Sequence, residues 1–199
     1  MAHQSCRYGL PKIIIERHDA VLSRISKRIK KGTKRDWTIK IDETVHSGTR
    51  LRPDLYLESS DGNEVILADV ADPYEDGLEA MRNAWDRKVN KYEPLCDLFK
   101  AQGKKASILP LVVGSLGCWW APTTVSLEKL GVNKTMSRKE IPEITTMVVE
   151  FSKNCYWNYI FGDGFTPASN DYGTGKPIRR EWKTGRNWIP PSLPQPNKK

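Results

Sequence analysis

Apolar positions recur with a helical period early in the chain. Between residues 13 and 31 they return every three or four positions, which places them on one face of a helix. This face consists of Ile15, His18, Leu22, Ile25 and Ile29. A second, basic stripe consists of Arg17, Arg24, Arg28 and Lys31. The pattern predicts an amphipathic helix that ends at Gly32.

Shorter apolar runs then predict strands. Residues 37–45 begin with apolar side chains at alternate positions, and residues 53–58 and 65–70 form two further runs. The last run is apolar enough for a central strand. Asp61-Gly62 lies between the second and third runs and is typical of a tight hairpin turn. We therefore expect three strands, of which the second and third form a hairpin.

The second half of the chain returns to helices. Residues 75–92 predict a helix that ends or kinks at Pro94. Residues 107–114 predict a strand, and Pro110 within it favours a place at the edge of the sheet. A short helix near residues 125–130 and a longer one over residues 137–161 follow.

The element order α-β-β-β-α-β predicts an α/β fold with a mixed central sheet flanked by helices and a C-terminal helical extension. We expect one domain over residues 1–161. Residues 162–199 are expected to form an irregular, basic tail rich in Trp and Pro.

Charge and cysteine usage narrow the class of protein. The net charge is +8, yet residues 53–100 are net acidic between two basic flanks. This suits a protein that binds a polyanion and clusters carboxylates for a cation, although an unevenly charged solvated surface is the alternative. The four cysteines form no C-x-x-C pair, which favours reduced thiols in the cytosol or nucleus. Neither a signal peptide nor a membrane-spanning run is expected.

The hairpin predicts a pair of carboxylates. If Asp61 and Gly62 are the two loop residues, Asp54 lies directly opposite Asp69 on the same face, with Cβ atoms roughly 4.5–5.5 Å apart. Like charges so opposed destabilise a sheet, so the pair is expected to hold a hard divalent cation. The alternative is that the two aspartates form one edge of a solvated face.

The helix after the hairpin supplies a cation. A helical wheel places Lys88 closer to the centre of the apolar stripe than Lys91 or Arg87, so Lys88 is the lysine best directed at the sheet. It would polarise an attacking water or balance charge on a phosphate. The alternative is a side chain that packs its stem on apolar surface and keeps its charge in water.

These residues together resemble a known family. Arg52-Pro53-Asp54, the apolar run that ends in Asp69-Val70, and Lys88-x-x-Lys91-Tyr92 resemble the restriction-like endonuclease domain of early-branching, site-specific non-LTR retrotransposons. That domain belongs to the PD-(D/E)-x-K nuclease superfamily. Residues 16–21 and 110–117 fit as well, so the resemblance covers roughly residues 3–160. The superfamily's commonest lysine position is Ala71 here, so the resemblance is to members whose lysine has moved to the helix.

The resemblance implies an α-β-β-β-α-β nuclease core with Asp54 and Asp69 as ligands of Mg²⁺ or Mn²⁺. It implies that the chain is the C-terminal part of a longer polyprotein with a reverse transcriptase, acting in the nucleus. Such elements nick chromosomal DNA and prime reverse transcription from the exposed 3′ end. His3 and Cys6 look like the end of a zinc knuckle that precedes this domain.

From the residues and the resemblance we expect a metal-dependent endonuclease acting on double-stranded DNA. Lys88, or else Lys91, supports the water or the phosphate. Lys91 and Tyr92 brace the site or contact DNA, and His18 or Glu16 closes the site from the first helix. The residues expected to bind DNA are Arg17, Arg24, Arg28, Lys31 and Arg52. Two alternatives remain open: a DNA-binding module with weak or no catalysis, and a nuclease selective for branched DNA.

Overall fold

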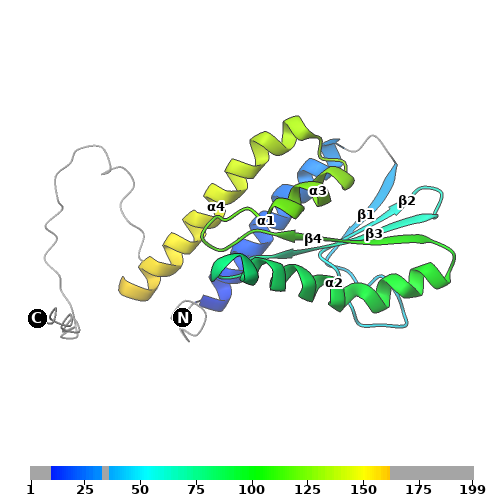
Figure 1. Cartoon of the computed structure of the whole chain (residues 1–199), viewed down its shortest axis with the longest axis horizontal. Helices are drawn as coiled ribbons and strands as arrows, with labels where there is room; N and C mark the ends of the chain where they lie inside the picture. The colour runs from blue at the N-terminus through cyan, green and yellow to red at the C-terminus, as the bar shows by residue number, and fades with distance from the viewer. Residues whose placement is uncertain (1–9, 33–35, 162–199) are drawn as a thin grey trace, which may run out of the picture. The chain divides into compact units, whose positions relative to one another are not determined.

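Four strands form one mixed sheet in the computed structural model, which describes residues 10–32 and 36–161 (Figure 1). Their order in the sheet is β1 (Trp37–Ile41), β2 (Leu55–Ser59), β3 (Glu64–Ala71) and β4 (Lys105–Val112). The pairs β1–β2 and β2–β3 are antiparallel, whereas β3 and β4 are parallel. Parallel neighbours require a crossover connection, and α2 (Gly77–Ala101) provides it.

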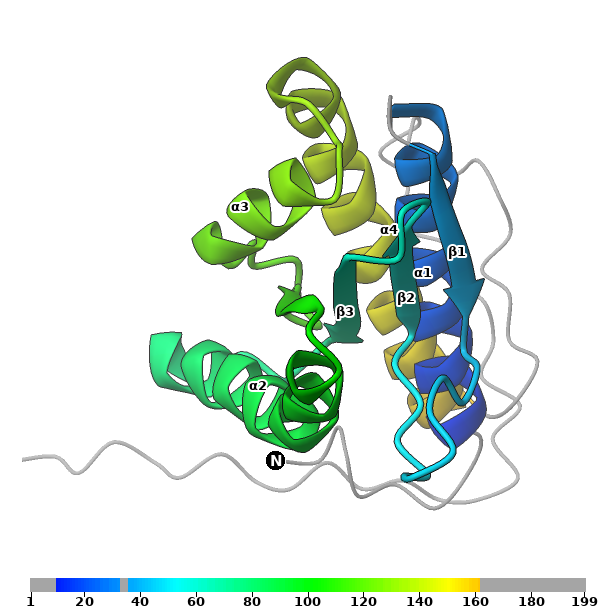
Figure 2. The ribbon, with the colours of Figure 1, turned by 90° about the vertical axis from the view of Figure 1, so that its right-hand side faces the viewer.

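The helices cover both faces of the sheet. On one face α1 (Leu10–Gly32) packs beside α4 (Lys134–Phe161), and α2 lies on the other face (Figure 2). The short helix α3 (Ala121–Lys129) contacts β4 and α4. The expected α/β architecture, a mixed sheet flanked by helices, is therefore present.

Alternation along the strands determines which side chains each helix meets. In β2, Leu55 and Leu57 join the core beneath α1 and α4, while Tyr56 between them packs against α2. In β3, Val65 and Leu67 likewise face α2. Asp69 follows in the same alternation, so this buried carboxylate belongs to the α2 face of the sheet.

Several element bounds differ from the expected ones. The first strand ends at Ile41 and the second begins at Leu55, so residues 42–54 form a connection without regular structure. The helix expected to end or kink at Pro94 continues to Ala101. Its apolar face extends past the proline through Leu95, Cys96 and Phe99, all buried, and this packing offsets the hydrogen bond that proline cannot donate.

The described helices and strands belong to one compact unit, Met1–Phe165. The expected tail over residues 162–199 lies outside the described residues, as do His3 and Cys6. Among the described residues, no helix is both long enough and apolar enough to cross a membrane.

Candidate active site

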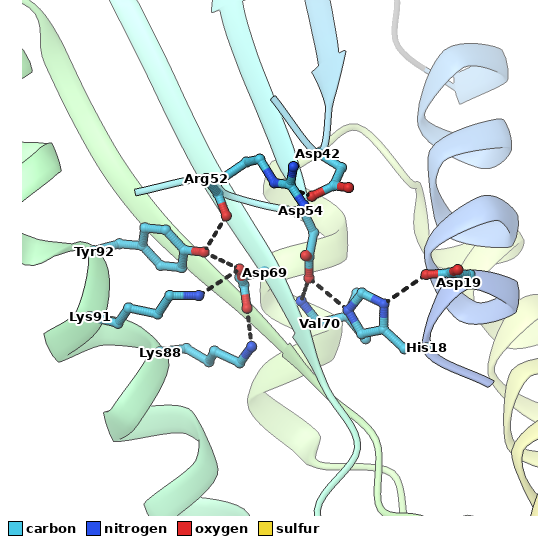
Figure 3. A network of polar contacts seen from close by, with 10 residues as sticks. All are labelled: His18, Asp19, Asp42, Arg52, Asp54, Asp69, Val70, Lys88, Lys91 and Tyr92. Carbon is cyan, nitrogen blue, oxygen red and sulfur yellow. Dashed lines mark hydrogen bonds and ion pairs between the residues drawn. The ribbon is translucent and has the colours of Figure 1, made fainter. Parts of the chain in front are cut away.

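Asp69 is the centre of the polar cluster at the end of the sheet where β3 finishes and β2 begins (Figure 3). Its side chain is only 2% exposed. One carboxylate oxygen accepts a hydrogen bond from Lys88 Nζ, and the other accepts one from the Tyr92 hydroxyl. Lys91 Nζ lies 3.8 Å from that second oxygen. A carboxylate so buried requires such partners, because burying an unpaired charge is strongly unfavourable.

The hairpin has the register expected from its turn. Leu55 pairs with Ala68 and Glu58 with Val65, so continuing the same register brings Asp54 opposite Asp69. The paired residues stop one position short of these aspartates, and Asp54 lies directly before β2. The Asp54 carboxylate accepts hydrogen bonds from the Val70 backbone N–H at 2.6 Å and from His18 Nε2 at 3.0 Å.

The two carboxylates therefore point to different helices, Asp54 toward α1 and Asp69 toward α2 (Figure 3). The expectation that both would face the same side holds for the backbone register but not for the carboxylate of Asp54. Lys88 nonetheless links the two, since it binds Asp69 and its charge also lowers the pKa of Asp54.

Hydrogen bonding and burial set the charges of the site. The bond to Asp54 raises the pKa of His18 to about 9 despite the opposing effect of burial, so His18 is cationic at neutral pH. Burial alone would raise the pKa of Asp54, but the bonds from His18 and Val70 lower it below its usual value. Burial, and then the bond to Asp69, raise the pKa of Tyr92, which stays a neutral hydroxyl.

Lys88 and Lys91 differ as the helical wheel suggested. The Lys88 side chain is 24% exposed and bonded to Asp69, whereas that of Lys91 is 46% exposed and lies over the Tyr92 ring. Tyr92 is fully buried, and its hydroxyl also lies 2.8 Å from the carbonyl oxygen of Arg52. Tyr92 thus fixes the segment before Asp54 to α2, and Lys88 reaches deepest into the site.

The residues expected to bind DNA occupy three different settings. Arg17 is buried, with Nε 2.5 Å from Asp72 and a second bond to Ser152 of α4, so its assignment to an exposed basic stripe is wrong. Lys31 is exposed. Arg52 borders the site and is half exposed.

Arg24 and Arg28 occupy the third setting, because both pair with the buried Glu140 of α4 and are only partly exposed. Glu143 is a further partner of Arg24. These ion pairs hold α1 against α4, which the helical wheel of α1 alone does not reveal.

Two acidic residues near the site were not assigned to it from the sequence. Asp42 forms an ion pair with Arg52 at 2.7 Å, and its backbone N–H donates to the Asp54 carbonyl at 3.1 Å. Asp72 binds Arg17, and its charge contributes, after the larger effect of Asp54, to the raised pKa of His18. Glu16, the alternative to His18, lies 3.8 Å from Lys12 on exposed α1 surface.

The donor set limits which metal the site suits. Within the described residues, no group of three or more His, Cys, Asp or Glu side chains is arranged to hold a metal ion. Two carboxylates are few for Zn²⁺ or Ca²⁺ but fit Mg²⁺, which keeps several waters and uses one or two carboxylates together with substrate phosphates. Asp54 Oδ1, which accepts no hydrogen bond from the described residues, is the oxygen most open to such an ion.

No protein-family model and no curated protein matches this sequence.

Proposed function

We propose that this chain is a Mg²⁺- or Mn²⁺-dependent endodeoxyribonuclease that cuts one strand of double-stranded DNA at a time. The observation that carries the proposal is the arrangement of Asp54, Asp69 and Lys88. Two carboxylates from neighbouring strand ends lie within electrostatic reach of one lysine, at the end of a sheet. An Asp–Asp–Lys group of this kind is suited to hydrolysis of a phosphodiester.

Asp54 and Asp69 would hold the metal ion, and the ion would supply a Lewis acid that activates a water at neutral pH. Asp69 is fixed for this role by Tyr92 and Lys88, and Asp54 by the Val70 N–H and His18. Both carboxylates are thus held in place before substrate arrives, which lowers the cost of organising the site.

Lys88 would stabilise negative charge on the scissile phosphate. Its ammonium is compact, partly exposed and carried on a flexible stem, so it can turn from Asp69 toward a phosphate oxygen. Lys91, more exposed and 3.8 Å from Asp69, would contact the phosphate from the solvent side. His18, cationic and bonded to Asp54, would keep that carboxylate ionised.

In its biological setting the enzyme would nick a chromosomal target and so expose a 3′ end for reverse transcription. This part of the proposal depends on the resemblance of Arg52-Pro53-Asp54 and Lys88-x-x-Lys91-Tyr92 to retrotransposon endonuclease domains. The partner would be the reverse transcriptase region of the same polyprotein, acting in the nucleus.

One observation favours a DNA-binding module without catalysis. Three cations, His18, Lys88 and Lys91, already balance the two carboxylates, so the site does not need a metal for neutrality. A binding module would retain DNA affinity in EDTA and would show no metal-dependent cleavage.

Nicking of supercoiled plasmid with Mg²⁺ or Mn²⁺ tests the proposal. We expect wild type to produce open circles, and Asp69→Ala to lose this activity. Lys88→Ala is expected to lose more activity than Lys91→Ala, because Lys88 lies deeper in the site. Equal nicking by wild type and Asp69→Ala would contradict the mechanism, and the reverse order of the lysine variants would transfer the role to Lys91. Branched and nicked substrates, tested in parallel, would reveal a structure-selective nuclease.

A further inference from the structure

The Asp42–Arg52 ion pair lies beside Asp54, on the side away from His18 (Figure 3). Arg52 Nε is 2.7 Å from Asp42 Oδ1, and the two side chains are 56% and 54% exposed. Within residues 10–32 and 36–161, Asp42 is the one partner of the Arg52 guanidinium. An ion pair this exposed contributes little to stability, so it is easily exchanged for another partner.

The backbones of both residues are fixed by the site itself. The Asp42 N–H donates to the carbonyl oxygen of Asp54, and the Arg52 carbonyl oxygen lies 2.8 Å from the Tyr92 hydroxyl. Asp42 also has a positive φ of 53°, which no other non-glycine residue in the described part of the chain adopts. Contacts with Asp54 and Tyr92 therefore fix the backbone positions from which both side chains extend at the edge of the site.

Arg52 has the chemistry of a phosphate ligand. A guanidinium binds phosphate oxygens through two parallel N–H bonds, and in Arg52 the carboxylate of Asp42 occupies the Nε position. Because the Asp42 N–H is bonded to the Asp54 carbonyl oxygen, the ion pair lies next to a carboxylate that would hold the reacting phosphate through its metal ion. A neighbouring backbone phosphate that binds Arg52 would then compete with a carboxylate that is already in place.

We propose that Arg52 binds a DNA backbone phosphate adjacent to the scissile one, and that Asp42 competes with that phosphate for the Arg52 guanidinium. Asp42 then lowers the affinity of the site for any phosphate that does not fit well enough to displace it. This role of Asp42 rests on the proposed nuclease function. Removing the Asp42 carboxylate should therefore strengthen DNA binding.

Asp42→Asn is a clean test of this competition. Asparagine tolerates positive φ at least as well as aspartate, so the variant removes the charge and keeps the backbone conformation. Asp42→Gly, which also accepts positive φ, removes the side chain altogether and should behave in the same way. Asp97→Asn is the matched control, because Asp97 forms a comparably exposed ion pair with Lys100 near the end of α2.

Binding is measured by fluorescence anisotropy with a labelled DNA duplex in EDTA, so that no cleavage occurs. We expect Asp42→Asn and Asp42→Gly to bind DNA about 2–5-fold more tightly than wild type, a change typical of one exposed ion pair. Arg52→Ala should weaken binding and reduce the dependence of log affinity on log salt by about 0.9, the value for one phosphate contact. Asp97→Asn should stay within about 1.5-fold of wild type, because screening limits its effect on a distant site.

The double variant separates competition from a general effect of charge. In the Arg52→Ala background, Asp42→Asn should leave binding unchanged, since there is no guanidinium left to compete for. Unchanged or weaker binding by both Asp42 variants would overturn the inference, and so would an equal gain in the Arg52→Ala background. Because these measurements need no cleavage, they stand even if wild type fails to nick DNA, in which case only the nuclease proposal falls.

Discussion

Two carboxylate–lysine–tyrosine groups lie on the α2 face of the sheet, one at each end. The Asp69 group consists of Asp69, Lys88 and Tyr92. The Glu58 group consists of Glu58, Lys104 and Tyr56. Glu58 accepts hydrogen bonds from Lys104, at 2.5 Å, and from the Tyr56 hydroxyl. The residue types and bonding are alike, and the two lysines are 24% and 25% exposed.

The groups differ in burial and in what surrounds them. Asp69 is 2% exposed and has a second carboxylate, Asp54, within reach of the same lysine, whereas Glu58 is 26% exposed. Solvation and a modest Coulomb attraction are enough to account for a partly exposed ion pair such as Glu58–Lys104. The site around Asp69 instead gathers two carboxylates and several cations at one end of the sheet, and such a cluster of partly buried charges is expected where function requires it. The comparison indicates that residue types alone do not identify a site.

The largest expected difference between the groups is in catalysis. Lys88→Ala should reduce plasmid nicking about 100-fold, the typical loss when one group that stabilises transition-state charge is removed. Lys104→Ala removes an equally exposed, carboxylate-bound lysine and should leave the nicking rate within about 2-fold, because surface changes far from a site have small effects. Similar losses in both variants would remove the distinction between the groups.

The tyrosines should differ in stability. Tyr92→Phe removes the hydroxyl that donates to one oxygen of the buried Asp69 carboxylate, while Lys88 still binds the other oxygen, and should lower the free energy of unfolding by about 1–2 kcal/mol. Tyr56→Phe removes a bond to a carboxylate that water can solvate, and should cost about 0.5 kcal/mol or less. Urea denaturation in EDTA measures both, and a larger effect of Tyr56→Phe would contradict the burial argument.

Metal should stabilise the protein through Asp69 and Asp54, and not through the Glu58 group. With a Mg²⁺ concentration about ten times the dissociation constant, binding adds about 1.4 kcal/mol to the free energy of unfolding. For a domain of this size we expect a rise in melting temperature of about 3–6 °C. Asp69→Asn should abolish the rise and Glu58→Gln should retain it. A shift that survives in Asp69→Asn would assign the ion to another site.

The smallest expected effect is on the pH dependence of stability. The pKa of His18 rises from 6.5 to about 9 on folding, so its bond to Asp54 stabilises the protein fully below pH 6.5 and is lost as pH rises through about 9. Partial exposure reduces this contribution to about 1 kcal/mol. In EDTA, the stability difference between wild type and His18→Gln should therefore shrink over this range. A difference that stays constant or grows with pH would contradict the assigned charge of His18.

The Glu58 group should show the opposite sign. Its bond to Lys104 lowers the pKa of Glu58, so the stabilisation is present at neutral pH and is lost as pH falls through the folded-state pKa. Comparing Glu58→Gln with wild type across the acidic range measures this dependence.

Much of the sheet and of the site follows from local sequence patterns. Asp61-Gly62 predicts the hairpin register that pairs Leu55 with Ala68. The loop, residues 60–63, is longer than two residues but is symmetric about Asp61-Gly62, so the register is the same, and Gly62 has a positive φ of 71°. The wheel of α2 predicts that Lys88 lies deeper than Lys91, because both positions depend only on the apolar stripe of their own helix.

What the sequence does not predict depends on contacts between distant segments. Arg17 is buried because α4, more than a hundred positions later in the chain, packs on that side of α1 and supplies Ser152. The direction of the Asp54 carboxylate depends on His18, which belongs to α1. Helical periodicity describes one element at a time and contains no information about which faces of two elements meet.

The central claim is that the Asp69 group, and not the Glu58 group, belongs to a metal-dependent nuclease site. The most direct test is plasmid nicking by Asp69→Asn and Glu58→Gln at equal protein concentration, with Mg²⁺ or Mn²⁺ and with EDTA. Each substitution replaces one sheet carboxylate by its amide. We expect wild type and Glu58→Gln to nick the plasmid at similar rates only when metal is present, and Asp69→Asn not to nick it. Equal nicking by Asp69→Asn and wild type, or nicking that persists in EDTA, would contradict this claim.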